Sequence, residues 1–278
     1  MDMVNKKLDY FVVDVFTDRV FGGNPAGVCL LDEWLPDDIL QSIAMENNLS
    51  ETAFLVKNEK TESIRASYDL RWFTPMIEID LCGHATMGSA YVLFNSVEAT
   101  VDKLEFYTQS GILTVERNND MLWMDLPSRP ATPAENYKCI KKALGLNEYK
   151  CYKSADILIV IDNEEDVKRI SPDFQALKEI KEEAKMQGDN FVVIVTAKGT
   201  DCDFVSRVFA PNCGVDEDPV TGRAHCVLTP YWSKELDKTS MTARQLSSRG
   251  GQLWCNDEGE RVKIGGKTVL YLRGQISI

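Results

Sequence analysis

The sequence predicts a mixed α/β fold of two similarly built domains, each a curled β-sheet wrapped around a central apolar helix. Three observations lead to this prediction. Short β-rich runs dominate the first half, a helix that is apolar on nearly every side interrupts them, and the same pattern recurs in the second half. The 278 residues, 44% hydrophobic and 27% charged, suffice for two ordinary domains and exclude disordered and fibrous classes.

The strands of the first half are short runs of β-branched, aromatic and alternating apolar residues bounded by turn residues. We expect them at residues 8–16, 26–31, 52–57, 63–73, 104–108, 112–117 and 121–126. Two helices interrupt these strands. One covers residues 36–47, with Pro36 in its first turn and Asp37 and Asp38 complementing the helix dipole. The other covers residues 85–95, and its apolar character on all sides places it inside the sheet.

A proline-rich stretch, residues 127–133, separates the two halves and is interpreted as a linker. We therefore expect domains at residues 1–128 and 129–278, with the last strand free to pack back on the first domain. The second half predicts helices at 134–144 and 172–186, and strands at 157–161, 191–196, 203–209, 246–253, 261–264 and 268–276. An apolar segment at residues 224–232 begins as a helix that Pro230 bends or ends.

An internal repeat supports two domains of one design. The pattern R-x-F-x-P, an acidic loop, a glycine and an apolar helix begins at Arg71 and again at Arg207. The glycines that open the two helices are Gly83 and Gly222. A recurrence at half the chain length predicts pseudo-twofold related domains; the alternative is a chance match of five residues.

Charge and hydropathy exclude several partners. The formal net charge of −12 opposes attraction to phosphate backbones and anionic lipid, so we expect no nucleic acid partner. The longest apolar runs, such as residues 157–161 and 191–197, are far shorter than the roughly 20 residues that a membrane crossing needs. Residues 1–8 lack the apolar core of a signal peptide. We expect a cytoplasmic protein with no membrane contact.

The cysteines and histidines predict no metal centre and the glycines no nucleotide site. Eight cysteines are scattered without a C-x-x-C pair, which is typical of reduced thiols. With only His84 and His225, and no closely spaced Cys/His group, the usual zinc pattern is missing. Residues 22–27, GGNPAG, match neither glycine-rich nucleotide pattern. We therefore expect no metal and no other cofactor.

The two apolar helices indicate the class of substrate. A helix N-terminus presents unpaired N–H groups and a partial positive charge, so two such ends facing each other would bind a carboxylate. Gly83, Gly88 and Gly222 allow close backbone approach there, and Thr221 is a candidate N-cap. We therefore expect a small organic anion as the substrate; the alternative is that both are ordinary helix starts.

Four runs of sequence resemble the phenazine-biosynthesis isomerase (PhzF-like) family. They are DVFTDRVFGGNPA at residues 14–26, SETAF at 50–54, CGHAT at 82–86 and DEDPVTG at 216–222. They occur in the family's order and extend nearly from end to end. The resemblance implies a diaminopimelate-epimerase-like fold, an active site between the two α/β domains, and a homodimer.

The resemblance also implies the site residues. Glu51 matches the glutamate that shuttles a proton between carbons of the substrate, and a base at neutral pH needs a carboxylate whose pKa is raised by partial burial. His84 and Asp218 match the other active-site residues, while Asn24, Cys82, Gly83 and Gly222 belong to the substrate-binding motifs. At a helix start, a neutral His84 would donate to developing negative charge. The alternatives are a solvated Glu51, a capping or core His84, and an Asp218 that only marks a turn; His225 is expected to pack.

Two residues affect the choice of reaction. The family commonly has a small hydroxyl residue where this chain has Arg223, which either grips a substrate carboxylate, turns to solvent or fills the pocket. Cys82 resembles half of the two-thiol arrangement of epimerases and could have a lowered pKa at its helix N-terminus. Its second-domain counterpart is expected to be Asp218, which disfavours a two-cysteine racemase and leaves a Cys82/Asp218 pair open.

The leading hypothesis is a cofactor-independent isomerase that moves a proton within a small carboxylate, with Glu51 as general acid and base. An amino-acid epimerase on the same fold is the alternative enzyme. A protein that binds a small metabolite without turning it over is the alternative from another class.

Overall fold

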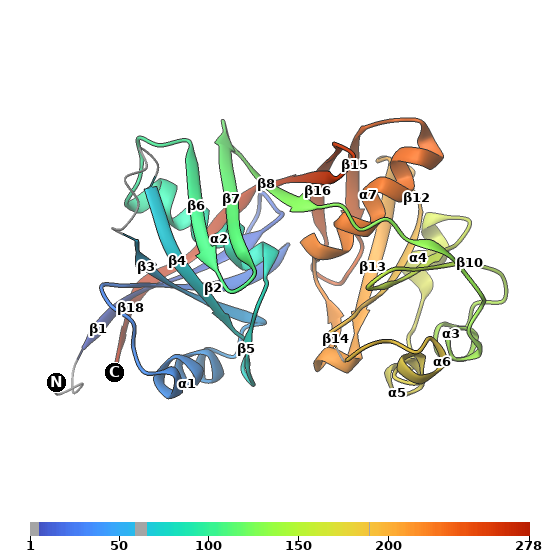
Figure 1. Ribbon diagram of the computed structural model, residues 1–278, viewed down its shortest axis with the longest axis horizontal. Helices are drawn as coiled ribbons and strands as arrows, with labels where there is room; N and C mark the ends of the chain where they lie inside the picture. The colour runs from blue at the N-terminus through green and yellow to red at the C-terminus, as the bar shows by residue number, and fades with distance from the viewer. Residues whose placement is uncertain (1–5, 59–65, 189) are drawn as a thin grey trace. The chain divides into compact units, whose positions relative to one another are not determined.

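The computed structural model describes residues 6–58, 66–188 and 190–278. The fold is mixed α/β, as predicted, and divides into two compact units (Figure 1). The first unit is Met1–Asp125 together with Gly265–Ile278, and the second is Leu126–Ile264. The second unit thus begins three residues before the expected boundary, and the chain returns to the first unit at Gly265. Within the described residues, no helix is both long enough and apolar enough to cross a bilayer.

The first unit is a curved set of strands around one helix. Its strands are β1 (Lys7–Val15), β2 (Asn24–Leu31), β3 (Glu51–Lys57), β4 (Ala66–Phe73), β5 (Glu78–Ile79), β6 (Lys103–Thr108), β7 (Gly111–Asn118), β8 (Met121–Pro127) and β18 (Thr268–Ser277). Strand β18, red in Figure 1, runs antiparallel beside β1. Helix α1 (Asp37–Asn47) begins one residue later than expected, because Pro36 is its N-cap. Of the expected strand 63–73, residues 63–65 lie outside the described residues.

Helix α2 (Gly83–Ser96) is the central apolar helix that the sequence predicts. Ten of its fourteen residues are buried, so no side of the helix faces solvent along its length. Figure 1 shows it enclosed by the strands of the first unit. Gly88 permits its close approach to the sheet, because a Cβ there would lie 2.8 Å from Val13 Cγ2.

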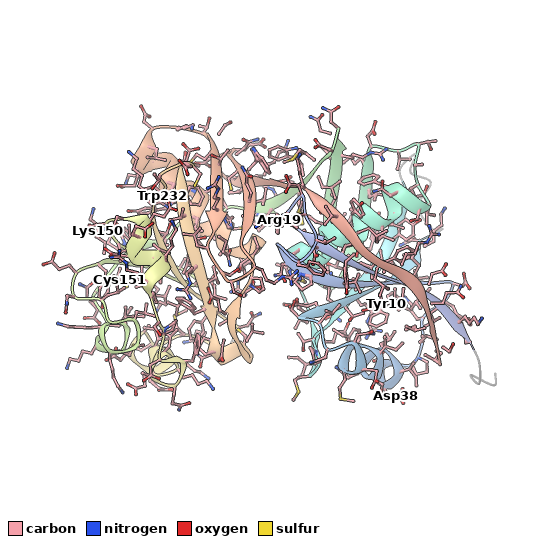
Figure 2. All side chains as sticks on the ribbon, turned by 180° about the vertical axis from the view of Figure 1, so that it is seen from behind. Tyr10, Arg19, Asp38, Lys150, Cys151 and Trp232 are labelled. Atoms are coloured by element: carbon pink, nitrogen blue, oxygen red, sulfur yellow. The ribbon has the colours of Figure 1, made fainter. Side chains whose placement is uncertain are left out.

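The second unit repeats this plan. Its strands are β9 (Thr132–Ala134), β10 (Lys150–Lys153), β11 (Ile157–Val160), β12 (Val193–Lys198), β13 (Phe204–Ala210), β14 (Val215–Asp218), β15 (Ser240–Gln245), β16 (Gly251–Asp257) and β17 (Arg261–Gly266). Its helices are α3 (Lys138–Leu144), α4 (Glu164–Arg169), α5 (Phe174–Leu177), α6 (Ile180–Glu183) and α7 (Gly222–Leu236), with a 3-10 turn at Pro211–Cys213. Helix α7 packs on β13 through Trp232, labelled in Figure 2, whose indole stacks on Phe204 at 5.8 Å and donates to Thr196 Oγ1.

The order and direction of strand pairing are the same in the two units. In the first, β1–β2 is antiparallel, β2–β3 parallel, β3–β4 and β4–β5 antiparallel, β4–β6 parallel and β6–β7 antiparallel. The second unit has the same series of antiparallel and parallel pairs, in the order β10–β11, β11–β12, β12–β13, β13–β14, β13–β15 and β15–β16. The internal repeat in the sequence therefore reflects a repeated topology.

The repeated R-x-F-x-P motif has one structural role. Arg71 on β4 forms two hydrogen bonds of 2.7 Å to the carboxylate of Glu78 on β5. Arg207 on β13 forms the same pair with Glu217 on β14, at 2.7 and 2.8 Å. Each guanidinium also lies 5.1 Å from the phenylalanine ring two residues later. These bidentate pairs fix the hairpin that leads into each central helix.

Two expected helices were wrong in extent. The helix expected at 134–144 begins only at Lys138, because residues 132–134 pair with β10 as strand β9. The helix expected at 172–186 is two short helices, α5 and α6. Between them, Glu179 N–H bonds to Ala176 O and Lys181 N–H to Lys178 O, three residues back, so tighter turns replace the α-helical pattern.

The expected strand at 246–253 was also wrong. It spans the turn between β15 and β16, in which Gly250 adopts a positive φ of 63°. Helix α7 is longer than expected, because it continues through Pro230 to Leu236. Proline removes the hydrogen bond to the carbonyl four residues earlier, which is Cys226 O. Arg129 N–H donates to that carbonyl at 2.9 Å, so the helix continues without an unsatisfied group.

Candidate functional site

Three of the predicted site residues meet in the first unit. Glu51 is the first residue of β3, Cys82 is the N-cap of α2, and His84 is the second residue of that helix. Glu51 Oε2 lies 3.2 Å from His84 Nε2, and Cys82 Sγ lies 3.6 Å from His84 Nδ1. The β4–β5 hairpin brings the start of α2 back to the beginning of β3, where residues 31 positions apart in the chain become neighbours.

Asn24, the first residue of β2, completes the surroundings of the imidazole. It is fully buried, and its Nδ2 lies 3.3 Å from His84 Nδ1. Its Oδ1 accepts from the Ser50 hydroxyl at 3.2 Å, and that hydroxyl also lies 3.3 Å from Pro25 O. The structure thus gives Asn24, expected among the substrate-binding residues, a direct role in orienting the His84 ring.

The exposed fraction of the side chain distinguishes Glu51 from His84. The Glu51 side chain is 16% exposed and the His84 side chain 6%, so the carboxyl is the group that a ligand reaches first. Glu51 Oε2 and His84 Nε2 are both buried, and among the described residues neither has a partner with hydrogen-bonding geometry. A reacting molecule that engages these atoms therefore competes with their mutual 3.2 Å ion pair.

The protonation of His84 and Cys82 differs from the expected neutral imidazole and the expected thiol of lowered pKa. Burial disfavours the His84 imidazolium, but the Glu51 carboxylate 3.2 Å away favours it and raises the pKa of His84. Cys82 shows the reverse of the expected activation. Burial and the Glu51 carboxylate raise its pKa, so Cys82 is a thiol rather than a base near neutral pH.

The Asn24 amide can support either state of His84. A neutral ring accepts from Asn24 Nδ2, as observed. An imidazolium must donate from Nδ1, which requires the amide to be turned so that its oxygen faces the ring. The Ser50 hydroxyl then accepts from the turned amide and donates to Pro25 O, so the amide and the hydroxyl each have a partner. The site can therefore gain or lose a proton at His84 without a change of backbone.

Asp218 belongs to a separate cluster in the second unit. It ends β14, and its Oδ2 accepts from the hydroxyl of Thr221, the N-cap of α7, at 2.5 Å. Gln245, fully buried on β15, accepts from Thr221 N–H at 2.9 Å and donates to Asp218 O at 2.7 Å. Sequence analysis missed Gln245, because its strand was placed wrongly and an isolated glutamine carries no signal.

Arg223 pairs with the protein itself. Its Nη2 and Nε contact the two carboxylate oxygens of the fully buried Asp156 at 2.9 and 3.3 Å. Its Nη1 donates to Asn190 Oδ1 at 2.7 Å and Nη2 to Asn190 O at 3.0 Å. Asp156 also accepts from Val192 N–H at 3.0 Å. The carboxylate that Arg223 grips is therefore an internal one, which pins two loops to the start of α7.

His225 packs, as expected. It is fully buried on α7, its Nδ1 lies 2.8 Å from Thr221 O, and its ring is 5.9 Å from Phe204. Burial lowers the pKa of His225 to about 4, so the ring is neutral.

Comparison with known proteins identifies the family. Residues 13–274 match the family model described as phenazine biosynthesis-like protein. The chain belongs to this family. An uncharacterized isomerase of Pseudomonas aeruginosa is 46% identical over 273 residues, which cover 98% of this chain and 99% of the relative. The expected enzyme class, an isomerase, agrees with the name of this relative.

Solved structures show the same fold. A PhzF family protein of Enterococcus faecalis has a TM-score of 0.91 and 44% identity, covering 98% of this chain and all of its own. A predicted epimerase of Pseudomonas aeruginosa has a TM-score of 0.72 at 18% identity, covering 97% of this chain and 99% of its own, and shares the fold alone.

The internal repeat of this PhzF-like chain shows how the two units have diverged. Cys82 and Thr221 are the N-caps of α2 and α7, so the counterpart of Cys82 is Thr221 and the expectation of Asp218 was wrong. Two residues after the N-cap, the first unit has His84 and the second unit has Arg223. A two-thiol racemase arrangement is therefore replaced by one thiol and one hydroxyl.

The counterpart of Glu51 follows from strand register. Thr52 pairs with Phe73 and Val193 with Phe209, and these phenylalanines hold the same place in the repeated motif. Glu51, just before Thr52, therefore corresponds to Val192, so the second unit has an aliphatic side chain where the first has its carboxyl.

Proposed function

We propose that this protein is an isomerase that moves a proton within a small carboxylate substrate, with Glu51 as the general acid and base. The observation that carries the proposal is the contact of Glu51, partly exposed, with the buried His84 at the start of the central helix, 3.2 Å away. Geometry of this kind places a base beside a group that can stabilise negative charge.

The reaction would proceed in two proton transfers. The Glu51 carboxylate accepts a proton from a carbon next to an electron-withdrawing group, and the charge left on the substrate is stabilised by the His84 imidazolium and by the N–H groups at the start of α2. Glu51 then returns the proton at another carbon.

Several features favour a carboxylate substrate. Helix α2 begins at Gly83, close to Glu51, and helix N-termini bind anions. The imidazolium adds a positive charge at the same place. Asp218, held by Thr221 and Gln245 in the second unit, is proposed as a second polar group that takes part, so Asp218→Asn should slow turnover.

Solvent exchange tests the role of Glu51. Small carboxylates are incubated with the protein in deuterated water, and incorporation of deuterium is followed by NMR. We expect Glu51→Gln to reduce incorporation by about 10²–10⁴-fold, the usual contribution of a general base. Glu46→Gln, at an exposed position on α1, is the matched control and should exchange like the wild type. Equal incorporation by Glu51→Gln and wild type would exclude Glu51 as the base.

An epimerase is the second candidate, because the Cys82 thiol lies in the same cluster as Glu51 and could return the proton to the same carbon. Such an enzyme would abolish the optical activity of a chiral substrate without moving a double bond. The isomerase changes the position of the double bond, which NMR distinguishes.

A further inference from the structure

We propose that Glu51, Cys82 and His84 form a binding site for a thiophilic divalent cation such as Zn²⁺, and that the bound cation inhibits the enzyme. The binding itself does not depend on the proposed function, whereas the inhibition rests on it. The three side chains offer one carboxylate oxygen, one imidazole nitrogen and one sulfur, all within 4.8 Å of one another. This mixture of donors suits Zn²⁺ better than Mg²⁺ or Ca²⁺.

The distances are close to those that a tetrahedral cation needs. Bonds of about 2.0–2.3 Å to oxygen, nitrogen and sulfur imply separations of about 3.3–3.6 Å between ligand atoms. Glu51 Oε2 and His84 Nε2 are 3.2 Å apart, so one cation can bridge them with little movement. Cys82 Sγ lies 3.6 Å from Nδ1 of the same ring and within 4.8 Å of the other ligand atoms. Three protein ligands leave the fourth position for water.

Two of the ligand atoms face each other. Oε2 of Glu51 and Nε2 of His84 are buried and lie 3.2 Å apart as an ion pair whose contact lacks hydrogen-bonding geometry. A cation between them would bond both atoms. The far nitrogen of the ring faces the Asn24 amide. With a cation on Nε2 the ring proton stays on Nδ1, which would donate to Asn24 after the amide is turned so that its oxygen faces the ring, as the second nitrogen of metal-bound histidines does.

Binding would release protons. The cation loses water as its bonds to sulfur, nitrogen and oxygen form, the Cys82 thiol gives its proton to solvent, and a charged His84 gives up its Nε2 proton. No oxidation or reduction is involved. Affinity should therefore rise as the pH increases, because the ligand forms of the two side chains are the thiolate and the neutral imidazole. A bound cation occupies the Glu51 lone pair, which would stop proton abstraction.

Titration with Co²⁺ tests the site directly, because a Co²⁺–thiolate bond produces a charge-transfer absorption in the near ultraviolet. We expect the wild-type protein to develop this band with one Co²⁺ per chain and to lose it when Zn²⁺ is added. Cys82→Ser should lack the band, while Cys213→Ser, at an exposed cysteine, should keep it. Glu51→Gln should weaken the affinity at least tenfold, which provides a second test if Cys82→Ser does not fold.

A wild-type protein without the band, or a band that persists in Cys82→Ser, would overturn the proposal. An unchanged affinity in Glu51→Gln would do the same. Failure of the cation site can be distinguished from failure of the proposed function. Loss of deuterium exchange with unchanged Co²⁺ affinity in Glu51→Gln would remove the cation site alone. Weakened Co²⁺ binding with unchanged exchange in that variant would remove the isomerase mechanism alone.

Discussion

His84 is the residue whose charge state most affects the chemistry. Burial opposes its charge, and the Glu51 carboxylate raises its pKa. We therefore predict that ¹H–¹³C NMR of the ring shows a pKa well above the ordinary value of about 6.5, and that Glu51→Gln lowers it. An unchanged His84 pKa in that variant would contradict the ion pair.

The same shift predicts how stability depends on pH. A group whose pKa is raised in the folded state contributes stability that is complete below its unfolded pKa and is lost as the pH rises through the folded value. The free energy of unfolding should therefore fall with pH from about 6.5 up to the folded pKa of His84. Urea unfolding of wild type and Glu51→Gln across this range measures the difference, and the variant should show a smaller decline.

Arg223 illustrates what residue-level reasoning can and cannot predict. Its chemistry, a bidentate grip on a carboxylate, follows from the side chain, and the structure has that grip. Its partner does not follow, because Asp156 lies 67 positions away in the chain. Glu51 and His84 were named through the family resemblance, since local sequence gives an isolated glutamate no special status.

The start of α7 depends on the Arg223–Asp156 pair. We predict that Arg223→Met destabilises the protein by about 3–5 kcal/mol, because it leaves a buried carboxylate without its partner. Lys142→Met, which breaks an exposed pair with Glu179, should cost less than about 1 kcal/mol. Urea unfolding measures both. A loss for Arg223→Met as small as that for Lys142→Met would show that the pair is unimportant for stability.

Close packing of α2 against β1 depends on Gly88. Alanine improves helix propensity by about 1 kcal/mol, but its Cβ would lie 2.8 Å from a Val13 methyl, and overpacking costs about 1–3 kcal/mol. We predict a net loss of about 1 kcal/mol for Gly88→Ala in thermal or urea unfolding. Ser96→Ala, at an exposed position of α2, should change stability by less than about 0.5 kcal/mol. Stabilisation by Gly88→Ala would mean that the contact relaxes freely.

Elements with strong local patterns were predictable and those that depend on distant partners were not. The apolar character of residues 85–95 predicts α2, because a helix with apolar residues on all sides must be buried on all sides. Continuation of α7 past Pro230 depends on Arg129, a residue from another segment, which bonds the carbonyl that proline cannot. Strand β15 was not predicted, and the strand expected at 246–253 covers the turn and only the first three residues of β16.

At the scale of the whole chain, the duplicated topology was predictable from the R-x-F-x-P motif. Its arginine and phenylalanine serve the same ion pair and ring contact in each unit. The divergence of the copies could not be predicted from that motif. His84 and Glu51 in one unit correspond to Arg223 and Val192 in the other. One copy therefore has a carboxyl beside an imidazole, and the other has an internal ion pair between Arg223 and Asp156.

Chemical rescue tests the central claim most directly. Glu51→Ala removes the carboxylate and leaves room for a small one, so deuterium incorporation into the substrate should fall sharply and return in proportion to added formate. Glu46→Ala should behave like the wild type with and without formate. Incorporation by Glu51→Ala at the wild-type rate, without any formate, would contradict the assignment of the proton transfer to Glu51.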